Sequence, residues 1–294
     1  LGIGAVGVGS LAYASLDEVN AYVLRRVEVP ILPRGARPIR VLQIADLHLT
    51  PRTSARVEWV SRLAGLEPDL VIDTGDNLAH PDSVSIVTAA LGRLLDKPGL
   101  FVWGSNDYYA PTFKNPLTYL TRPSRMGREH PIELPWRELG TEFEQAGWVD
   151  LTHRRFSLEI NGTRLGFRGG DDAHLGRDQY ALVAGPVDQE TEGDVVIGVT
   201  HAPYRTVIDA MTYDGCELVI AGHTHGGQVC VPFYGALVTN CDLDPARVKG
   251  LSTNSAGGKT SFLHVSAGLG TSPYAPIRFA CRPEATLLTL VPRV

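Results

Sequence analysis

Short runs of apolar residues alternate with amphipathic segments along the first hundred residues of the chain. Residues 39–45, 69–73 and 99–103 are apolar enough to form buried strands. Residues 54–66 carry apolar side chains at near-helical spacing, and together with residues 82–95 they are predicted to form the intervening helices. Repeated strand–helix units of this kind predict a parallel sheet that is covered by helices.

The second half of the chain continues this pattern after an interruption. Residues 110–134 are rich in Pro, Arg and Thr and lack periodicity, which predicts a surface excursion that frames a site, or a plain connecting loop. A helix is expected over residues 135–146, and a hairpin with an Asn-Gly turn over residues 156–167. Strand pairing should therefore change from parallel to antiparallel at the hairpin. The remaining predicted elements are strands at 195–199, 217–220, 261–265 and 285–290 and a helix through residues 208–210.

Composition and charge indicate a globular protein and argue against nucleic-acid binding, but they do not indicate an activity. The chain has 294 residues, and 44% of them are hydrophobic, as in an ordinary globular protein with a large core. The formal net charge is -5 and no basic patch stands out, so a nucleic-acid duplex is not an expected partner. We expect one large domain at residues 38–294, preceded by an N-terminal segment at residues 1–37.

The N-terminal segment begins with an apolar stretch. Residues 1–16 contain no charged side chain and are rich in Gly, Ala, Val and Leu. They fall short of the roughly 20 residues that a membrane-spanning helix needs, so the stretch could be the remnant of a membrane anchor, of a secretory signal, or a surface-packed segment. We expect a membrane-associated or extracytoplasmic location, and a cytoplasmic one stays open.

The spacing of the cysteines argues against a zinc ribbon. No CxxC pair occurs among the four of them, which are Cys216, Cys230, Cys241 and Cys281. Nor do they form the dense framework of a small secreted domain. Buried free thiols are expected, and one or two disulfides are the alternative for a domain outside the cytoplasm.

Polar side chains gather where the predicted strands end. In chain order they are Asp46, His48, Asp76, Asn106, His201, His223 and His225. Ligands of open α/β sheets bind at the carboxyl ends of the strands, so these side chains are expected along one edge. Carboxylate, amide and imidazole groups suit borderline divalent metals. Seven ligands are too many for one ion, and two ions roughly 3.5–4 Å apart with a shared carboxylate would use them all.

These residues resemble the motifs of the calcineurin-like metallophosphoesterases. The family motifs, in order, are DxH, GD, GNHD, a single His and GHxH. Here they take the form Asp46-Leu47-His48, Gly75-Asp76, Gly104-Ser105-Asn106-Asp107, His201 and Gly222-His223-Thr224-His225. The similarity spans most of the chain. The later segments Gly268-Leu269-Gly270 and Arg282-Pro283-Glu284 resemble the bacterial YkuE-type branch, whose members are often tethered to a membrane.

The resemblance implies a four-layer α/β/β/α sandwich of two mixed sheets, with the metal site at the carboxyl ends of the strands. It also implies two divalent ions, chosen from Mn, Fe, Zn and Co. One ion would be held by Asp46, His48, Asp76 and His225, and the other by Asp76, Asn106, His201 and His223, so that Asp76 is the bridge. The implied activity is hydrolysis of a phosphoester by in-line attack of an activated water molecule.

One motif departs from the family pattern. The family has Gly-Asn-His-Asp where this chain has Gly104-Ser105-Asn106-Asp107. Without a gap, Ser105 takes the place of the ligand Asn, whereas a shift of one residue leaves Asn106 as the ligand. We favour Asn106, because an amide oxygen binds a divalent ion better than a neutral hydroxyl does. Either alignment removes the histidine that the family is usually thought to use for the leaving group.

The missing histidine leaves the acid step to another residue. Asp107 with a raised pKa is the first candidate, and His174, in the polar loop of residues 169–174, is the second. A leaving group of low pKa needs no acid, which favours a phosphodiester or pyrophosphate substrate, lipid-linked or nucleotide, over an alkyl monoester. The alternatives are a phosphomonoesterase or protein phosphatase on the same fold, and a binding scaffold that has lost catalysis.

Overall fold

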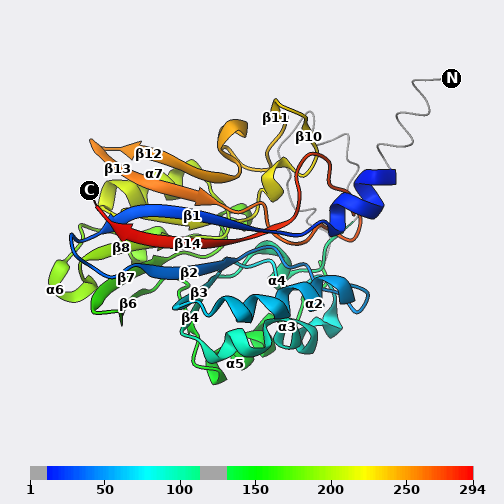
Figure 1. Ribbon diagram of the computed structural model, residues 1–294, viewed down its shortest axis with the longest axis horizontal. Helices are drawn as coiled ribbons and strands as arrows, with labels where there is room; N and C mark the ends of the chain where they lie inside the picture. Colours follow the sequence, from blue (N-terminus) through cyan, green and yellow to red (C-terminus); the bar gives the residue numbers. More distant parts are fainter. Residues whose placement is uncertain (1–11, 113–130, 294) are drawn as a thin grey trace.

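Two six-stranded sheets packed face to face form the centre of the computed structural model, which describes residues 12–112 and 131–293 (Figure 1). The strand order is β1-β14-β2-β3-β4-β5 in the first sheet and β12-β13-β9-β8-β7-β6 in the second. Helices cover the outer face of each sheet. The fold is therefore a four-layer α/β/β/α sandwich, as the resemblance predicts.

The first sheet is mixed. Its strands are β1 (Val23–Leu32), β2 (Ile39–Ile44), β3 (Leu70–Asp73), β4 (Gly99–Phe101), β5 (Val149–Asp150) and β14 (Glu284–Pro292). Strands β2 to β5 run parallel, whereas β14 is antiparallel to β2 and parallel to β1. Its outer face is covered by α2 (Ser54–Ser61), α3 (Val84–Leu91) and α5 (Trp136–Gln145). Leu42, Val71 and Phe101 share a buried apolar cluster there with Val87 and Phe143.

The second sheet is also mixed. Its strands are β6 (Arg155–Ile160), β7 (Thr163–Gly169), β8 (Val195–Val199), β9 (Leu218–Ala221), β12 (Gly250–Ala256) and β13 (Lys259–Val265). In the chain, α6 (Gln189–Glu192) precedes β8, and α7 (Arg205–Asp214) connects β8 to β9. Met211 of α7 packs in one cluster with Val196 and Val219 on the outer face. Between the sheets, Ile72 shares a cluster with Phe167.

Shorter elements complete the described chain. They are α4 (Ser105–Tyr108), β10 (Cys230–Val231) and β11 (Gly235–Ala236). Further helical turns lie at Tyr13–Asp17, Glu18–Asn20, Arg62–Leu66, Pro81–Ser83, Gly92–Asp96, Ala173–Leu175, Tyr180–Leu182, His225–Gly227 and Pro245–Arg247. No helix in residues 12–112 or 131–293 is long and apolar enough to cross a membrane.

A buried polar contact ties the two sheets together close to the strand ends. Gln43 of β2 lies 2.7 Å from Nδ1 of His264 on β13, and its amide nitrogen donates to the carbonyl of Ala221 on β9 at 2.9 Å. Burial lowers the pKa of His264 to about 4, so its imidazole stays neutral. The contact fixes the relative position of strands β2, β9 and β13.

Five described strands are not predicted from the sequence: β1, β5, β10, β11 and β12. β1 and β12 are the long ones among them. β1 pairs with β14 at the edge of the first sheet, a position where a proline such as Pro30 is tolerated, and the pairing register shifts between Pro30 and Leu32. β12 is an edge strand with mostly polar residues. β1 also precedes residue 38, so the first sheet contains residues on both sides of the domain boundary that the sequence suggests.

The expected change of strand pairing is found at the hairpin, but parallel pairing then resumes, and the later antiparallel pairs are β12–β13 and β14–β2. β6 and β7 are antiparallel, but β7, β8, β9 and β13 pair in parallel order, because helices and loops again return the chain to one edge. The predicted surface excursion falls largely on residues 113–130, and the apolar N-terminal stretch largely on residues 1–11, both outside the described residues. All four cysteines are free and buried, as expected.

Candidate metal centre

The backbone turns sharply directly after strands β2, β3 and β9. Five of the seven predicted ligands have positive φ angles: Asp46 (51°), His48 (42°), Asp76 (60°), His223 (71°) and His225 (50°). Non-glycine residues rarely adopt this conformation, and such strain clusters at functional sites. The turns allow side chains from three strand ends to face one another.

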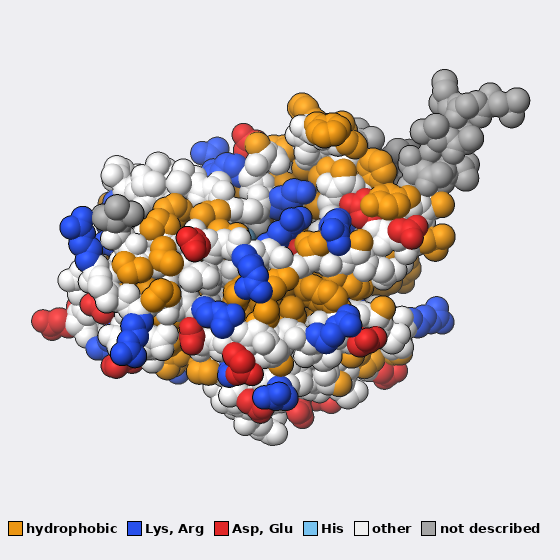
Figure 2. Space-filling view, viewed as in Figure 1, with side chains coloured by type: hydrophobic (Ala, Val, Ile, Leu, Met, Phe, Trp, Pro, Cys, Tyr) orange, Lys and Arg blue, Asp and Glu red, His pale blue; other side chains and the backbone are white. Residues whose placement is uncertain are grey.

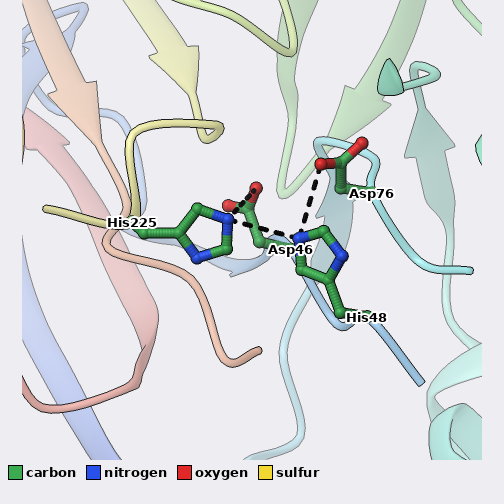
Figure 3. A group of neighbouring side chains, drawn as sticks. All are labelled: Asp46, His48, Asp76 and His225. Atoms are coloured by element: carbon green, nitrogen blue, oxygen red, sulfur yellow. Dashed lines mark hydrogen bonds and ion pairs between the residues drawn. The ribbon is translucent and has the colours of Figure 1, made fainter. Parts of the chain in front are cut away.

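A first cluster joins residues that follow three different strands. Ligand atoms of Asp46, His48, Asp76 and His225 all lie within 4.8 Å of one another. Nε2 of His48 is 3.2 Å from Nε2 of His225 and 3.4 Å from Oδ2 of Asp76. Figure 3 shows the four side chains converging, with Nε2 of His225 also 3.8 Å from Oδ1 of Asp46. One cation between these atoms would contact all four residues.

A second cluster lies on the other side of the Asp76 carboxylate. Nε2 of His201 is 3.1 Å from Nδ1 of His223 and 3.5 Å from Oδ1 of Asp76. The side-chain nitrogen of Asn106 donates to Oδ2 of Asp76 at 2.7 Å. All seven predicted ligands are therefore brought together, and Asp76 has one oxygen near each histidine group.

Backbone carbonyls orient two of the imidazole rings. Nδ1 of His201 lies 2.7 Å from the carbonyl of Thr74, and Nδ1 of His225 lies 3.0 Å from that of Gly270. A carbonyl only accepts, so each Nδ1 carries a proton and each Nε2 is turned toward the cluster. Two pairs of imidazole nitrogens face each other at 3.1–3.2 Å, and such a set of imidazole and carboxylate donors fits a divalent metal.

Burial keeps three of the histidines neutral. It lowers the pKa of His48 to about 4 and the pKa values of His223 and His225 well below their usual range. Neutral imidazole is the form that binds a metal. His201 differs: burial lowers its pKa, but the nearby Asp76 carboxylate and others outweigh this and raise the pKa to about 9.

The pKa values of the two predicted ligand carboxylates, Asp46 and Asp76, are shifted in opposite directions. Burial raises the pKa of Asp46 to about 7. Burial also acts to raise the pKa of Asp76, but His201, His48 and the hydrogen bonds from Asn106 reverse this and lower it. Asp76 is therefore ionised between the two histidine groups, where a divalent cation gains most from its charge.

Two glycines are required by the crowding around these carboxylates. A Cβ atom on Gly104 would overlap Oδ1 of Asp76 and the ring of His201. Gly268 has a φ of +66°, and a Cβ atom there would lie 2.6 Å from Oδ2 of Asp46. At both positions the backbone lies so close to a predicted metal-ligand side chain that a residue with a Cβ atom would clash with it.

The unusual motif of α4 separates its serine from its asparagine. The hydroxyl of Ser105 donates to Oδ2 of Asp172 at 2.7 Å. Asn106 contacts Asp76 twice, through its backbone nitrogen and its side-chain nitrogen, each at 2.7 Å. Asn106 is thus beside the ligand carboxylate, and Ser105 is engaged with the loop that follows β7.

The carboxylate of Asp107 is fully buried and accepts four backbone N–H groups. Oδ2 accepts those of Asp76 (2.7 Å) and Gly104 (2.9 Å), and Oδ1 accepts those of Asn77 (2.8 Å) and Leu78 (3.2 Å). Burial and the Asp76 charge raise the pKa of Asp107 to about 7, against the effect of these donors. The group holds together the loop that carries Asp76.

His174 lies beside the second cluster. Its ring centroid is 4.7 Å from that of His223, and its Nδ1 is 3.0 Å from the hydroxyl of Tyr204. The residue occupies a short helical turn, where its side chain is only partly buried. His174 is therefore adjacent to a predicted ligand without belonging to the predicted ligand set.

Two buried arginines support the ligand loops and escape prediction from the sequence. Arg278 donates to the carbonyls of Gly268 (3.0 Å) and Gly270 (2.7 Å). Arg56 donates to those of Leu47 (2.6 Å) and His48 (3.1 Å). No local motif marks either residue, because arginines in loops and helices are usually solvated.

A family model described as calcineurin-like phosphoesterase matches residues 39–227, which include every predicted ligand. The chain belongs to this family. It is therefore a hydrolase of phosphoester bonds, and the family implies divalent metal ions. The resemblance that the motifs suggest is confirmed.

Several bacterial relatives are similar along most of their length. "Uncharacterized metallophosphoesterase" of Aquifex aeolicus (strain VF5) is 28% identical over 290 residues, covering 95% of each chain. "Phosphodiesterase YaeI" of Escherichia coli (strain K12) is 26% identical over 290 residues, covering 97% of this chain and 93% of that protein. "Uncharacterized metallophosphoesterase YkuE" of Bacillus subtilis (strain 168) is 24% identical over 274 residues, covering 90% and 83%. The similarity to YkuE-type relatives agrees with the sequence motifs.

Proposed function

We propose that this chain is a dinuclear phosphodiesterase or pyrophosphatase. The observation that carries the proposal is the position of Asp76, whose two oxygens face His48 on one side and His201 on the other. A carboxylate placed between two groups of imidazoles is suited to bridging two divalent ions. The name of the relative YaeI, a phosphodiesterase, supports a diester substrate.

The proposed ligands divide between the two clusters. Asp46, His48, Asp76 and His225 would hold one ion, and Asp76, Asn106, His201 and His223 the other. When bound, such ions lower the pKa of a water molecule and neutralise phosphoryl oxygens. The chain itself supplies orientation: the carbonyls of Thr74 and Gly270 hold the rings of His201 and His225, and Arg278 holds the Gly270 loop.

The two alignments of the unusual motif differ in which residue meets the second ion. Asn106 contacts Asp76, whereas the hydroxyl of Ser105 is bonded to Asp172. This favours Asn106 as the ligand, with its amide rotated so that the oxygen faces the cluster; amide oxygen and nitrogen exchange places by such a rotation.

His174 is a better proposed acid than Asp107. Both oxygens of Asp107 already accept backbone N–H groups, so its carboxyl has no free oxygen to offer a leaving group. His174 lies partly exposed beside His223. We assign leaving-group protonation to His174 and loop positioning to Asp107. A lipid-linked or nucleotide diester or pyrophosphate is the proposed substrate class.

Metal analysis joined to a substrate panel tests this function. Purified protein should hold about two divalent ions per chain, since the seven ligands form two clusters. Chelation should abolish hydrolysis and lower the melting temperature, because the ions bind the folded site. Turnover should be higher on bis-p-nitrophenyl phosphate than on phosphoserine. One ion or none by elemental analysis contradicts the dinuclear site, and faster hydrolysis of phosphoserine contradicts the diester preference.

His174→Asn should act selectively on substrates with poor leaving groups. A general acid contributes about 10²–10⁴-fold, so kcat should fall by about 10²-fold or more on a diester with an alkyl leaving group. The loss on bis-p-nitrophenyl phosphate should stay below about tenfold, because nitrophenolate leaves without a proton. His80→Asn, at an exposed histidine away from the ligand clusters, is the matched control. An equal loss on both substrates would show that His174 does not act as the acid.

A further inference from the structure

Large hydrophobic side chains are exposed mainly in one region of the molecule. Of the eleven such residues in the described chain, eight belong to three segments near the N-terminal turn, the β10–β11 hairpin and the loop before β14. These eight are Tyr13, Leu16, Val229, Val231, Phe233, Tyr234, Leu237 and Tyr274. Monomeric proteins rarely expose so many together without a partner. We call this set the apolar surface.

The three segments of the apolar surface meet around Phe279. The rings of Tyr13 and Phe279 lie 6.4 Å apart in an edge-on arrangement, and Val229 forms a β-bridge with Phe279. The side chain of Gln228 donates to the carbonyl of Ala275 at 2.7 Å. Figure 2 shows hydrophobic side chains gathered over the hairpin and the N-terminal turn, with Lys and Arg side chains beside them.

The tip of the hairpin carries an aromatic residue that the turn does not need. Phe233 has a φ of +65°, a conformation that favours Gly or Asn. Its side chain is as exposed as in an extended peptide, at 111%, and that of Tyr234 is 77% exposed. The fold therefore gains neither turn geometry nor packing from Phe233.

Cations border the apolar surface. A hollow of about 420 Å³ is lined by Tyr13 and Phe279 and by three basic residues, Arg25, Lys249 and Arg282. The acidic residue in the same hollow, Glu18, turns its carboxylate to the backbone N–H groups of residues 280 and 281. Arg25 is also ion-paired with Glu284 at 3.0 Å, so the exposed cations of this hollow that have no carboxylate partner among the described residues are Lys249 and Arg282. In the sequence, the twelve residues before the turn Tyr13–Asp17 carry no charged side chain.

We propose that the apolar surface docks on a lipid bilayer that contains anionic phospholipids. Aromatic and aliphatic side chains on the hairpin would enter the boundary between headgroups and acyl chains, where Tyr is favoured. Lys249 and Arg282 would face the anionic headgroups. A second copy of this chain fits less well, because a two-fold contact through the same surface would bring its cations together.

Docking in this way would hold the metal centre close to the lipid. Phe233 is eight residues after His225, so even a fully extended chain separates them by no more than about 28 Å. The thiol of Cys230, at the base of the hairpin, also donates to the carbonyl of Gly226 at 3.2 Å. A phosphodiester or pyrophosphate carried by a lipid is then the substrate class. That last step rests on the proposed function, whereas docking itself does not.

Co-sedimentation of the full chain with lipid vesicles tests the proposal. The chain should bind vesicles of phosphatidylglycerol and phosphatidylcholine more tightly than vesicles of phosphatidylcholine alone, and added salt should weaken the binding. Phe233→Ser combined with Tyr234→Ser should reduce binding about tenfold or more. The matched control combines Leu182→Ser with Tyr213→Ser, an aliphatic and an aromatic residue that are 65% and 61% exposed and lie outside the apolar surface. Control binding should equal that of the unmodified chain.

Hydrolysis of soluble bis-p-nitrophenyl phosphate and the melting temperature check that the hairpin variant is folded. Vesicle binding is measured without substrate, so its failure is separate from a failure of the proposed activity. Absence of vesicle binding by the unmodified chain overturns the proposal, as does a hairpin variant that binds like the control. Light scattering that shows a dimer converted to a monomer by the hairpin substitutions overturns it in favour of self-association.

Discussion

Asp76→Asn is expected to lower kcat/KM on bis-p-nitrophenyl phosphate by at least about 10³-fold, the loss that corresponds to several kcal/mol of transition-state stabilisation by metal ions. The carboxylate lies 3.4 Å from Nε2 of His48 and 3.5 Å from Nε2 of His201. A neutral amide in its place loses the charge that would bridge two cations. Elemental analysis should show fewer than two ions per chain in the same preparation.

The fold should survive this substitution. Asp76 has a φ of 60°, and Asn tolerates that left-handed conformation as well as Asp does. Asp69→Asn is the matched control, because Asp69 precedes β3 and Asp76 follows it, so the control removes a carboxylate at the opposite end of the same strand. Circular dichroism should match for both variants. Retained hydrolysis in Asp76→Asn would refute the bridging role.

The strands that form the middle of each sheet could be predicted because their sequences are continuous apolar runs. β2, β3, β8 and β9 are covered on both faces and are almost entirely apolar; the polar residues in them are Arg40, Gln43 and Asp73. Edge strands lack that signature. β1 contains Pro30 and exposed arginines, and β12 is mostly polar, so neither pattern distinguishes a strand from a loop.

The ligands could also be predicted, because each follows a predicted strand and parallel strands end at one edge. Their roles needed the structure. The sequence could not tell whether Ser105 or Asn106 meets Asp76, since a one-residue shift changes which side chain points at the cluster. Nor could it show that the carboxylate of Asp107 is occupied by backbone groups more than 25 residues away in the chain.

Asp107→Asn should destabilise the protein as well as weaken the site. The carboxylate accepts backbone N–H groups on both oxygens, two on each. An amide keeps one oxygen, and its NH₂ group would face two donors. Each buried group left unpaired costs about 1–3 kcal/mol, so the free energy of unfolding should fall by about 2–6 kcal/mol. Urea unfolding of the metal-free protein measures this.

A purely catalytic role for Asp107 predicts a different result. If the carboxyl served as the general acid, Asp107→Asn would leave the unfolding free energy unchanged and would slow only substrates with poor leaving groups. Asp96→Asn is the control for the loss of a charge, because the Asp96 carboxylate is exposed at the end of the helical turn Gly92–Asp96. Because Asp107 binds the N–H of Asp76 directly, the positioning role predicts that metal content falls together with stability. Equal unfolding free energies for the Asp107 and Asp96 variants would contradict the positioning role of Asp107 in the Asp76 loop. Asp107 would then again be a candidate general acid.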